Sequence, residues 1–370
     1  MTTSLSRRAI RRPTALLFAA ALGAATLSAC SSSGDNADGG SDAGSDKETI
    51  QVVASTSIWA DVAQAVVNTA QTDVNIDVHA IVSGNSVDPH HFEPTAADIA
   101  RANEADVIIA GGGGYDAWLY QAVKNQDQII HALPLTDHDH GDHGDHDHGE
   151  HDHGHGDGHD HAHDEHDHGE HEHGNGHDHD HVHDADTVTM DEAKKIAAEH
   201  PEQVTNIDGN EHVWYDSAAI EKVATEVATL VNEANPEAKA TADPLVERVE
   251  GLKARIEKLP QRNYAQTEPI ADYIFKYTNS TDATPEGYRK ATVAEGEPTA
   301  ADLARFLEDI KQDKIDLLIF NPQTETDMTK RIRAAAEDKN IPVVEIGETP
   351  PEDTNFLDYY EEVVNALEAV

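Results

Sequence analysis

The sequence predicts an α/β protein of two lobes, each with a parallel sheet flanked by helices, joined by a long rigid helix. Three features favour this fold. Strand-like and helix-like segments alternate early in the chain, one short motif occurs twice, and an amphipathic helix bounded by prolines lies between the two copies. We therefore expect an N-terminal α/β lobe at 50–235, a connecting helix at 236–260 and a C-terminal α/β lobe at 261–370.

The N-terminal lobe begins with alternating strands and helices. Short runs of Val and Ile are typical of strands buried in a sheet, and alternation of apolar with polar residues indicates a half-buried strand. Strand, helix and strand in succession build a parallel sheet. Strands are expected at 50–53, 74–82, 107–110 and 127–133, with a helix at 58–67.

The repeated motif indicates a second lobe of the same kind. Residues 93–110 begin EPTAADIA and residues 297–320 begin EPTAADLA, so seven of the first eight positions agree. In each copy a threonine, Thr95 or Thr299, stands three residues before an aspartate, which is a capping-box-like helix start. Both copies then continue into a buried strand. Chance recurrence of a helix-start motif is the alternative.

The segment between the copies has a strong helical pattern. Apolar residues that recur at alternating intervals of four and three positions share one face of a helix. Prolines at 244 and 260 bound this segment, which would form an amphipathic helix and a stiff connector between lobes. The apolar residues are Leu245, Val249, Leu252, Ile256 and Leu259.

The N-terminus has the pattern of an export signal. Four arginines precede an apolar run from Ala15 to Leu27, which is shorter than the ~20 residues of a bilayer-spanning helix. The cleavage site that ends at Cys30 is similar to a lipobox. We therefore expect a lipoprotein signal peptide at 1–29 and lipidation of Cys30, with a flexible Ser/Gly/Asp-rich tether at 30–49. Ordinary secretory cleavage is the alternative, and both the general and the twin-arginine export routes stay open.

A histidine-rich insert occupies 137–186. Nineteen of the 25 histidines lie there, interleaved with Asp, Glu and Gly. Such a segment cannot bury enough apolar surface to fold alone, but neutral imidazole is a good ligand for zinc, copper and nickel. We expect loose, accessory metal binding, and a solvated insert without a role is the alternative. Its first histidines are His138, His140, His143, His146, His148, His151 and His153.

Charge and cysteine content exclude several classes of function. The net charge of −45 disfavours nucleic-acid binding through phosphate repulsion and favours cation capture. Cys30 is the only cysteine, which excludes internal disulfides and cysteine-based zinc sites. An exported metal hydrolase would need a general base beside the metal, and no HExxH motif occurs. A GxxxxGK[ST] nucleotide loop is also absent from the sequence.

Two histidines outside the insert stand in loops that precede helices. His90 follows Asp88-Pro89, and His212 lies in the stretch Glu211 to Asp216. Loops at the carboxyl ends of parallel strands are where open α/β sheets bind ligands. Each histidine alone is a weak signal, but the pair is suggestive in a chain that already shows a cation-binding composition.

These motifs resemble those of the metal-specific solute-binding proteins of ABC transporters, the zinc and manganese cluster. The resemblance rests on DPHHFEPT at 88–95, HVWYD at 212–216 and the insert between them. It implies two α/β lobes joined by a rigid helix, with one metal ion between them and no enzymatic activity. The ligands that it implies are His90, His212, Glu268 and Glu348, with Asp216 orienting an imidazole.

The resemblance also implies a cargo and partners. Two histidines and two glutamates resemble the manganese binders, whereas the histidine-rich insert and the higher affinity of zinc for such sites favour Zn²⁺. We expect Zn²⁺, with Mn²⁺ as the alternative. The chain would be a monomer held outside the cytoplasm by its lipid anchor, passing metal to a permease with a cytoplasmic ATPase. A histidine-rich surface metal buffer or adhesin is a further alternative.

Overall fold

The computed structural model describes residues 49–71, 73–84, 92–113, 116–133 and 187–370. Several sequence expectations lie outside these residues, so the structure does not test them. They are the signal peptide and Cys30, most of the tether, His90, and the histidine-rich insert at 137–186.

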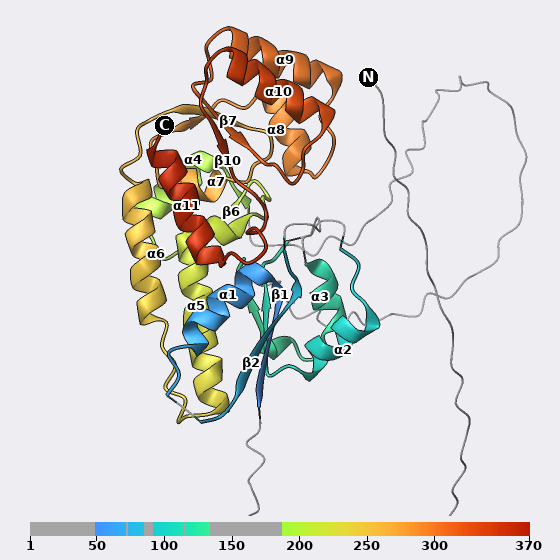
Figure 1. The fold of residues 1–370 in the computed structure, drawn as a ribbon, viewed down its shortest axis with the longest axis vertical. Coiled ribbons are helices and arrows are strands. Elements are labelled where there is room, and N and C mark those ends of the chain that lie inside the picture. The colour runs from blue at the N-terminus through green and yellow to red at the C-terminus, as the bar shows by residue number, and fades with distance from the viewer. Residues whose placement is uncertain (1–48, 72, 85–91, 114–115, 134–186) are drawn as a thin grey trace, which may run out of the picture. The chain divides into compact units, whose positions relative to one another are not determined.

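Two four-stranded parallel sheets organise the chain (Figure 1). The first has the order β2-β1-β3-β4, and all of its neighbouring strands run parallel. Its strands are β1 (Ile50–Thr56), β2 (Ile76–Val82), β3 (Val107–Ala110) and β4 (Ile129–His131). All four predicted strands are therefore confirmed. β1 runs past Val53 because it continues to pair with β2 as far as Thr56, opposite Val82.

The second sheet has the order β10-β9-β7-β8 and is also parallel throughout. Its strands are β7 (Asn263–Gln266), β8 (Thr281–Asp282), β9 (Leu317–Phe320) and β10 (Val343–Glu345). Counted along the chain, both sheets place their strands in the same order, second, first, third, fourth. The two lobes thus share one topology, as the repeated motif predicted.

The repeat falls at the equivalent place in each sheet. Its first copy forms α2 (Ala96–Glu104) before β3, and its second copy forms α9 (Ala300–Lys311) before β9, so each precedes a third strand. Both helices begin with a capping box, in which Thr95 pairs with Asp98 and Thr299 with Asp302. The predicted helix starts are confirmed.

Helices cover both faces of the first sheet. Alternate strand residues pack on opposite sides, so that Val52 and Ile109 face one core and Val53 and Ile108 face another. α1 and α5 lie over the first face, and α2 and α3 cover the second (Figure 1). The remaining bounds are α1 (Ser57–Val67), α3 (Ala117–Ala122), the 3₁₀ helix η2 (Gln126–Gln128) and α5 (Ser217–Ala234).

The second sheet is covered in the same way. Leu317 and Ile319 face the core that contains α7 and α11, whereas Ala265 and Leu318 face α8, α9 and α10. Both faces of β9 are therefore buried, as its uninterrupted apolar sequence Leu317–Phe320 requires. The helices are α7 (Asp272–Phe275), α8 (Glu286–Val293), α10 (Asp327–Asp338) and α11 (Phe356–Glu368).

The helix predicted at 236–260 corresponds to α6 (Asp243–Ile256), which is shorter at both ends. It buries Leu245, Val249, Leu252 and Ile256, as the spacing predicted, whereas Leu259 follows the helix and is only partly buried. α6 packs on α1, α5 and α11. A two-stranded parallel sheet precedes α5. Its strands are β5 (Thr187–Val188) and β6 (Asn206–Ile207), which α4 (Met190–Glu199) connects. The 3₁₀ helix η3 (Val213–Tyr215) follows β6.

One hydrophobic core receives residues from both sheets. Val52 of β1, Ile319 of β9 and Val344 of β10 belong to the same cluster of buried residues, with α5, α6 and α11 between them. Backbone contacts add to this, since the amide of Phe356 donates to Asp61 Oδ2 at 2.7 Å. The described residues of both sheets accordingly belong to one compact unit.

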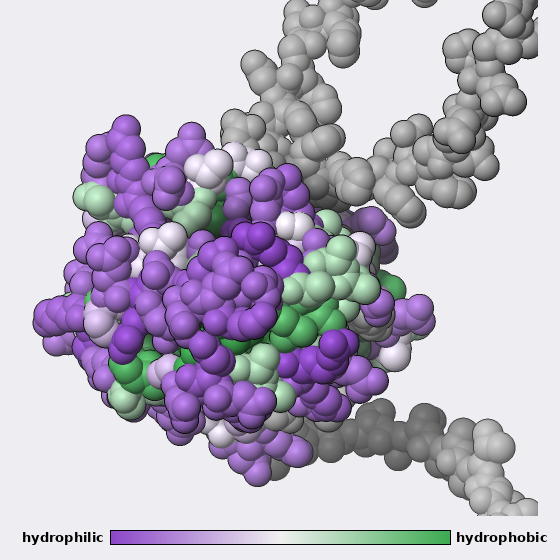
Figure 2. Space-filling model, turned by 90° about the horizontal axis from the view of Figure 1, so that it is seen from above, coloured by the Kyte–Doolittle hydropathy of each residue, from purple (hydrophilic) through white to green (hydrophobic). Residues whose placement is uncertain are grey.

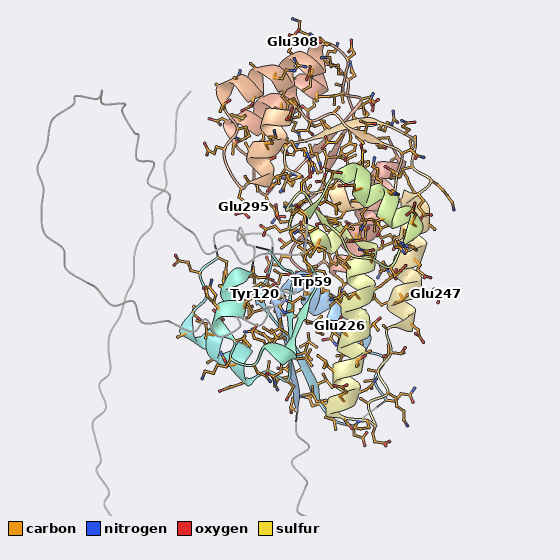
Figure 3. All side chains as sticks on the ribbon, turned by 180° about the vertical axis from the view of Figure 1, so that it is seen from behind. Trp59, Tyr120, Glu226, Glu247, Glu295 and Glu308 are labelled. Atoms are coloured by element: carbon orange, nitrogen blue, oxygen red, sulfur yellow. The ribbon has the colours of Figure 1, made fainter. Side chains whose placement is uncertain are left out.

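The surface is polar. Figure 2 shows hydrophilic residues over most of one face, with a smaller apolar area, and Glu247 on α6 and Glu308 on α9 lie on the outside of their helices (Figure 3). Within the described ranges, no helix has the length and apolar character needed to cross a bilayer.

Candidate metal centre

Three predicted ligands meet at one point. His212, Glu268 and Glu348 each offer a ligand atom, and these atoms all lie within 4.8 Å of one another. His212 Nε2 lies 3.4 Å from Glu348 Oε2 and 3.8 Å from Glu268 Oε1. Their side chains are 5%, 14% and 1% exposed in the order His212, Glu268, Glu348. The centre is therefore largely shielded from water.

The second sheet positions the two carboxylates. Glu268 follows β7, Glu348 follows β10, and between these strands β9 ends directly before Asn321. The carboxyl ends of parallel strands meet at one edge of a sheet, where α/β folds bind ligands. His212 reaches this edge from the loop between β6 and η3.

Asn210 fixes the ring of His212. Its Oδ1 accepts from the ring Nδ1 at 2.7 Å and from the backbone amide of His212 at 2.9 Å. The amide group is oriented because its Nδ2 donates to Pro269 O at 2.6 Å and to Asp272 Oδ2 at 2.9 Å. We assign the ring proton to Nδ1 on this basis, which makes Nε2 the nitrogen that can bind a metal.

A second asparagine holds both carboxylates. Asn321 is fully buried, and its Nδ2 donates to Glu268 Oε2 at 2.6 Å and to Glu348 Oε1 at 2.7 Å. Thr324 Oγ1 also donates to Glu268 Oε2, at 2.5 Å. The oxygens that face His212 are the other two, Glu268 Oε1 and Glu348 Oε2.

Asp272 anchors the support beneath His212. It is fully buried and accepts from Arg289, whose Nη1 and Nη2 lie at 3.1 and 2.8 Å from its two oxygens. Burial alone would lower the pKa of Arg289, but Asp272 and Asp282 outweigh it and raise that pKa. A permanent cation therefore compensates the carboxylate that orients Asn210.

Asp216 has a different role from the one predicted. The hydrogen bond to the ring of His212 comes from Asn210, whereas Asp216 pairs with Lys276 Nζ at 2.7 Å and accepts from Tyr277 Oη at 2.6 Å. Its Oδ1 also accepts from the amide of Ala218 at the start of α5. For the ring of His212 the prediction is wrong, because the carboxylate of Asp216 is held by Lys276 and Tyr277, which directly follow α7.

Two tyrosines beside the centre stay protonated. Burial raises the pKa of Tyr215 well above its ordinary value, with Tyr359 and Glu348 adding to the rise. Burial, with the charge of Glu268 adding, likewise raises the pKa of Tyr288. Both phenols are therefore neutral near neutral pH, and the imidazole and the two carboxylates are the candidate ligands that the described residues bring together.

The first sheet approaches the centre through Gly84. Thr349, which directly follows Glu348, donates from Oγ1 to Gly84 O at 3.1 Å. Gly84 has a φ of +76°, a conformation that favours glycine, and it stands six positions before His90 in the sequence. The predicted ligand His90 itself lies outside the described residues.

The structure brings together three of the four predicted ligands, His212, Glu268 and Glu348. Sequence reasoning missed both supporting asparagines. Asn321 had one available signal, because it follows a buried strand directly and so occupies the ligand-binding edge of a parallel sheet. Asn210 had a weaker signal, as a side chain two positions before a candidate ligand. Neither residue is chemically distinctive enough to single out without its partners.

The donor set suits a divalent first-row cation. One imidazole nitrogen and two carboxylate oxygens bind such ions, and two carboxylates at a shielded site favour a positive charge between them. Zn²⁺ and Mn²⁺ both accept these atoms as ligands.

The fold and this centre define the class of metal-binding substrate-binding proteins of ABC transporters. The family model described as zinc-uptake complex component A, periplasmic (ZnuA), matches residues 52–370. The chain therefore belongs to the ZnuA family. Members of this family are substrate-binding proteins of transporters and not enzymes.

The names of curated relatives refer to different metals. The iron ABC transporter substrate-binding lipoprotein MtsA of Streptococcus pyogenes serotype M1 is 38% identical over 114 residues, 30% of this chain and 33% of MtsA. The manganese ABC transporter substrate-binding lipoprotein PsaA of Streptococcus mitis is 33% identical over 113 residues, 30% and 32% of the two chains. This chain thus spans about a third of the length of the curated relatives it matches.

Solved structures share the fold. The crystal structure of ZnuA superposes with a TM-score of 0.52 at 14% identity, covering 87% of this chain and 98% of the other. The laminin-binding protein Lmb of Streptococcus agalactiae gives 0.53 at 12% identity, covering 86% and 98%. FpvC of Pseudomonas aeruginosa, solved with Mn²⁺, gives 0.51 at 12%, covering 87% and 96%.

Proposed function

We propose that this chain captures Zn²⁺ at His212, Glu268 and Glu348, with His90 as the fourth ligand, and delivers it to an ABC permease for import. The observation that carries the proposal is the convergence of Nε2 of His212 with one oxygen from each glutamate in a shielded centre. Four monodentate ligands make a tetrahedral zinc site with no position left for a reactive water.

The place of His90 in the chain supports its role as the fourth ligand. The described chain stops at Gly84, which Thr349 holds beside Glu348, and resumes at Phe92. His90 comes six residues after Gly84 in the sequence. Because an extended chain spans about 3.5 Å per residue, this stretch is long enough to reach the centre from Gly84.

Acidic side chains around the centre support cation capture. A pocket of about 590 Å³ adjoins Glu268. Fixed negative charge at its rim would raise the local cation concentration. The acidic residues that line it are Glu295, labelled in Figure 3, with Glu297, Glu325 and Asp327.

The remaining parts of the proposal concern location and the insert. A signal peptide at 1–29 would direct export, Cys30 would carry a lipid that anchors the chain to the membrane, and 30–49 would be a tether. The names of the relatives MtsA and PsaA, both lipoproteins, support this. The insert at 137–186 would raise the local metal concentration, and the chain would act as a monomer.

Calorimetric titration tests the proposal. Mature protein (31–370), the same protein without 137–186, and variants His90→Ala and His212→Ala are titrated with Zn²⁺ and with Mn²⁺. We expect one tight zinc site that survives the deletion and disappears in both histidine variants. Tight binding that prefers Mn²⁺ would replace the cargo and keep the transporter assignment. Binding that vanishes with the deletion would favour a histidine-rich surface buffer.

A further inference from the structure

Asn321 is built into the end of β9 in a single orientation. The side-chain Oδ1 of Asn321 accepts from the backbone amide of Gln323 at 3.0 Å. The backbone amide of Asn321 donates to Thr267 Oγ1 at 3.1 Å. Because Oδ1 is engaged as an acceptor, Nδ2 must be the atom that faces the two glutamates. Its two N–H groups therefore serve Glu268 and Glu348, one each.

This bridge divides each carboxylate into two unlike oxygens. Glu268 Oε2 and Glu348 Oε1 accept from Asn321, whereas Glu268 Oε1 and Glu348 Oε2 face Nε2 of His212. An oxygen that accepts from Asn321 keeps a second lone pair, but the hydrogen bond fixes the rotation of the carboxyl group and weakens any further bond of that oxygen to an ion. For a glutamate to bind one ion through both oxygens, its carboxyl group would have to rotate, which strains the hydrogen bond from Asn321. A buried amide that loses its acceptors is costly.

Cations differ in how much they gain when a carboxylate binds them through both oxygens. Zn²⁺ is satisfied by four ligands at about 2.0–2.2 Å, whereas Mn²⁺ belongs with the ions that prefer octahedral oxygen coordination. Two bidentate carboxylates would raise the number of oxygens around an ion. A bridge that keeps both glutamates monodentate therefore disfavours the ions with more ligands.

We propose that Asn321 is a positioning residue that selects Zn²⁺ over Mn²⁺ by holding Glu268 and Glu348 monodentate. The inference rests on the proposed function and adds the basis of its selectivity. Asn321 does not touch the ion, and it acts through the two carboxylates that it bridges. Thr324 contributes in the same sense at Glu268 alone, because it donates to the same outer oxygen.

Asn321→Ala tests this in the mature chain. Zn²⁺ and Mn²⁺ dissociation constants are measured in competition with a chromophoric chelator, and Co²⁺ replaces zinc as a probe of coordination number through its visible absorption. We expect zinc affinity to fall about 10- to 100-fold, the usual effect of removing such a support. The zinc-to-manganese ratio should narrow, and the intense absorption of tetrahedral Co²⁺ should weaken.

Asn103→Ala is the matched control. Asn103 lies on α2 and is only partly buried, but its Nδ2 likewise donates to two oxygens, the backbone oxygens of Ile99 on α2 and Ala122 on α3. Its loss should leave the metal ratio and the Co²⁺ spectrum unchanged. If Asn321→Ala fails to unfold cooperatively, Thr324→Val decides, with a smaller shift in the same direction.

The outcomes separate the inference from the proposed function. Suppose that the wild-type chain has one metal site and that the Asn321 and Thr324 variants keep the same ratio of Zn²⁺ to Mn²⁺ affinity and the same Co²⁺ spectrum. This result overturns the role of Asn321 and leaves the proposed function intact. A wild-type chain without a stoichiometric site overturns both.

Discussion

Asn210 Oδ1 accepts a hydrogen bond from Nδ1 of His212 at 2.7 Å, while Nδ2 of the same residue donates to Asp272 at 2.9 Å. One asparagine thus joins the ring of the proposed ligand His212 to the buried carboxylate of Asp272, whose charge Arg289 compensates. Supports of this kind set ring orientation and basicity in metal sites.

Removal of this support should weaken metal binding without removing the site. Asn210→Ala leaves all proposed ligands in place, so we expect zinc affinity to fall about 10- to 100-fold, measured by chelator competition. Asn232→Ala is a suitable control, because Asn232 also makes two hydrogen bonds, both to Ala240, far along the sequence from the ligands. Unchanged zinc affinity in Asn210→Ala would contradict the assigned role.

The buried pair of Lys276 and Asp216 should be coupled in stability. Both side chains are 0% exposed, with Nζ and Oδ2 at 2.7 Å. Lys276→Met leaves a buried carboxylate without its cation and should lower the free energy of unfolding by about 3–5 kcal/mol. The double variant with Asp216→Asn should recover part of this loss in urea denaturation. Strictly additive losses would show that the two charges do not interact.

His131 should make stability depend on pH. Burial, with the charge of Lys222 adding, lowers the pKa of His131 to about 4. The unfolded chain, with a histidine pKa of about 6.5, therefore binds more protons between these values. The contribution of neutral His131 is complete above pH 6.5 and is lost as the pH falls toward 4.

A phenylalanine at this position isolates the effect. His131→Phe keeps a ring against Tyr120, which stacks on His131 with centroids 4.9 Å apart. We expect the variant to lose less stability than the wild type between pH 6.5 and 5, by on the order of 1 kcal/mol because partial exposure screens the charge. His200→Gln at an exposed position is the control. Parallel pH profiles for wild type and His131→Phe would refute the prediction.

The capping boxes of the two repeated helix starts should contribute equally. Thr95 and Thr299 each accept from the backbone of an aspartate three residues on, at 3.3 Å in both cases. Alanine at either position should lower stability by about 1 kcal/mol, and the two losses should add because the boxes lie on helices of different sheets and their hydrogen bonds share no residue. Serine at either position should retain the cap. Unequal losses would indicate that the two starts are not equivalent in energy.

Local patterns were sufficient for the first sheet, α1, α6 and the two repeat helices. Val107–Ala110 is an uninterrupted apolar run and α6 carries Leu245 and Val249 at helical spacing, and both segments form the predicted elements. The two-residue strands β5, β6 and β8 were not predicted, because two residues carry no periodicity. They are strands only through pairing with distant partners, as Asn263 with Thr281.

The centre was harder to predict than the fold. His212, Glu268 and Glu348 came from the resemblance to a family, and the structure gathers them. The asparagine that bridges the glutamates lies 53 residues from one and 27 from the other. No local pattern reports a contact over such separations, and an asparagine after a strand has many possible uses.

The core that both sheets share has a thermodynamic consequence. Val52 and Ile319 belong to one cluster, and each sheet has a further, smaller cluster on its other face. Because unfolding of either half would expose the shared cluster, we expect a single melting transition. An ion held between His212 and the two glutamates would then raise the free energy of unfolding of the whole chain. The gain is about 4 kcal/mol when the free ion concentration is a thousand times the dissociation constant. The melting temperature of this protein would report how much of its cargo it carries.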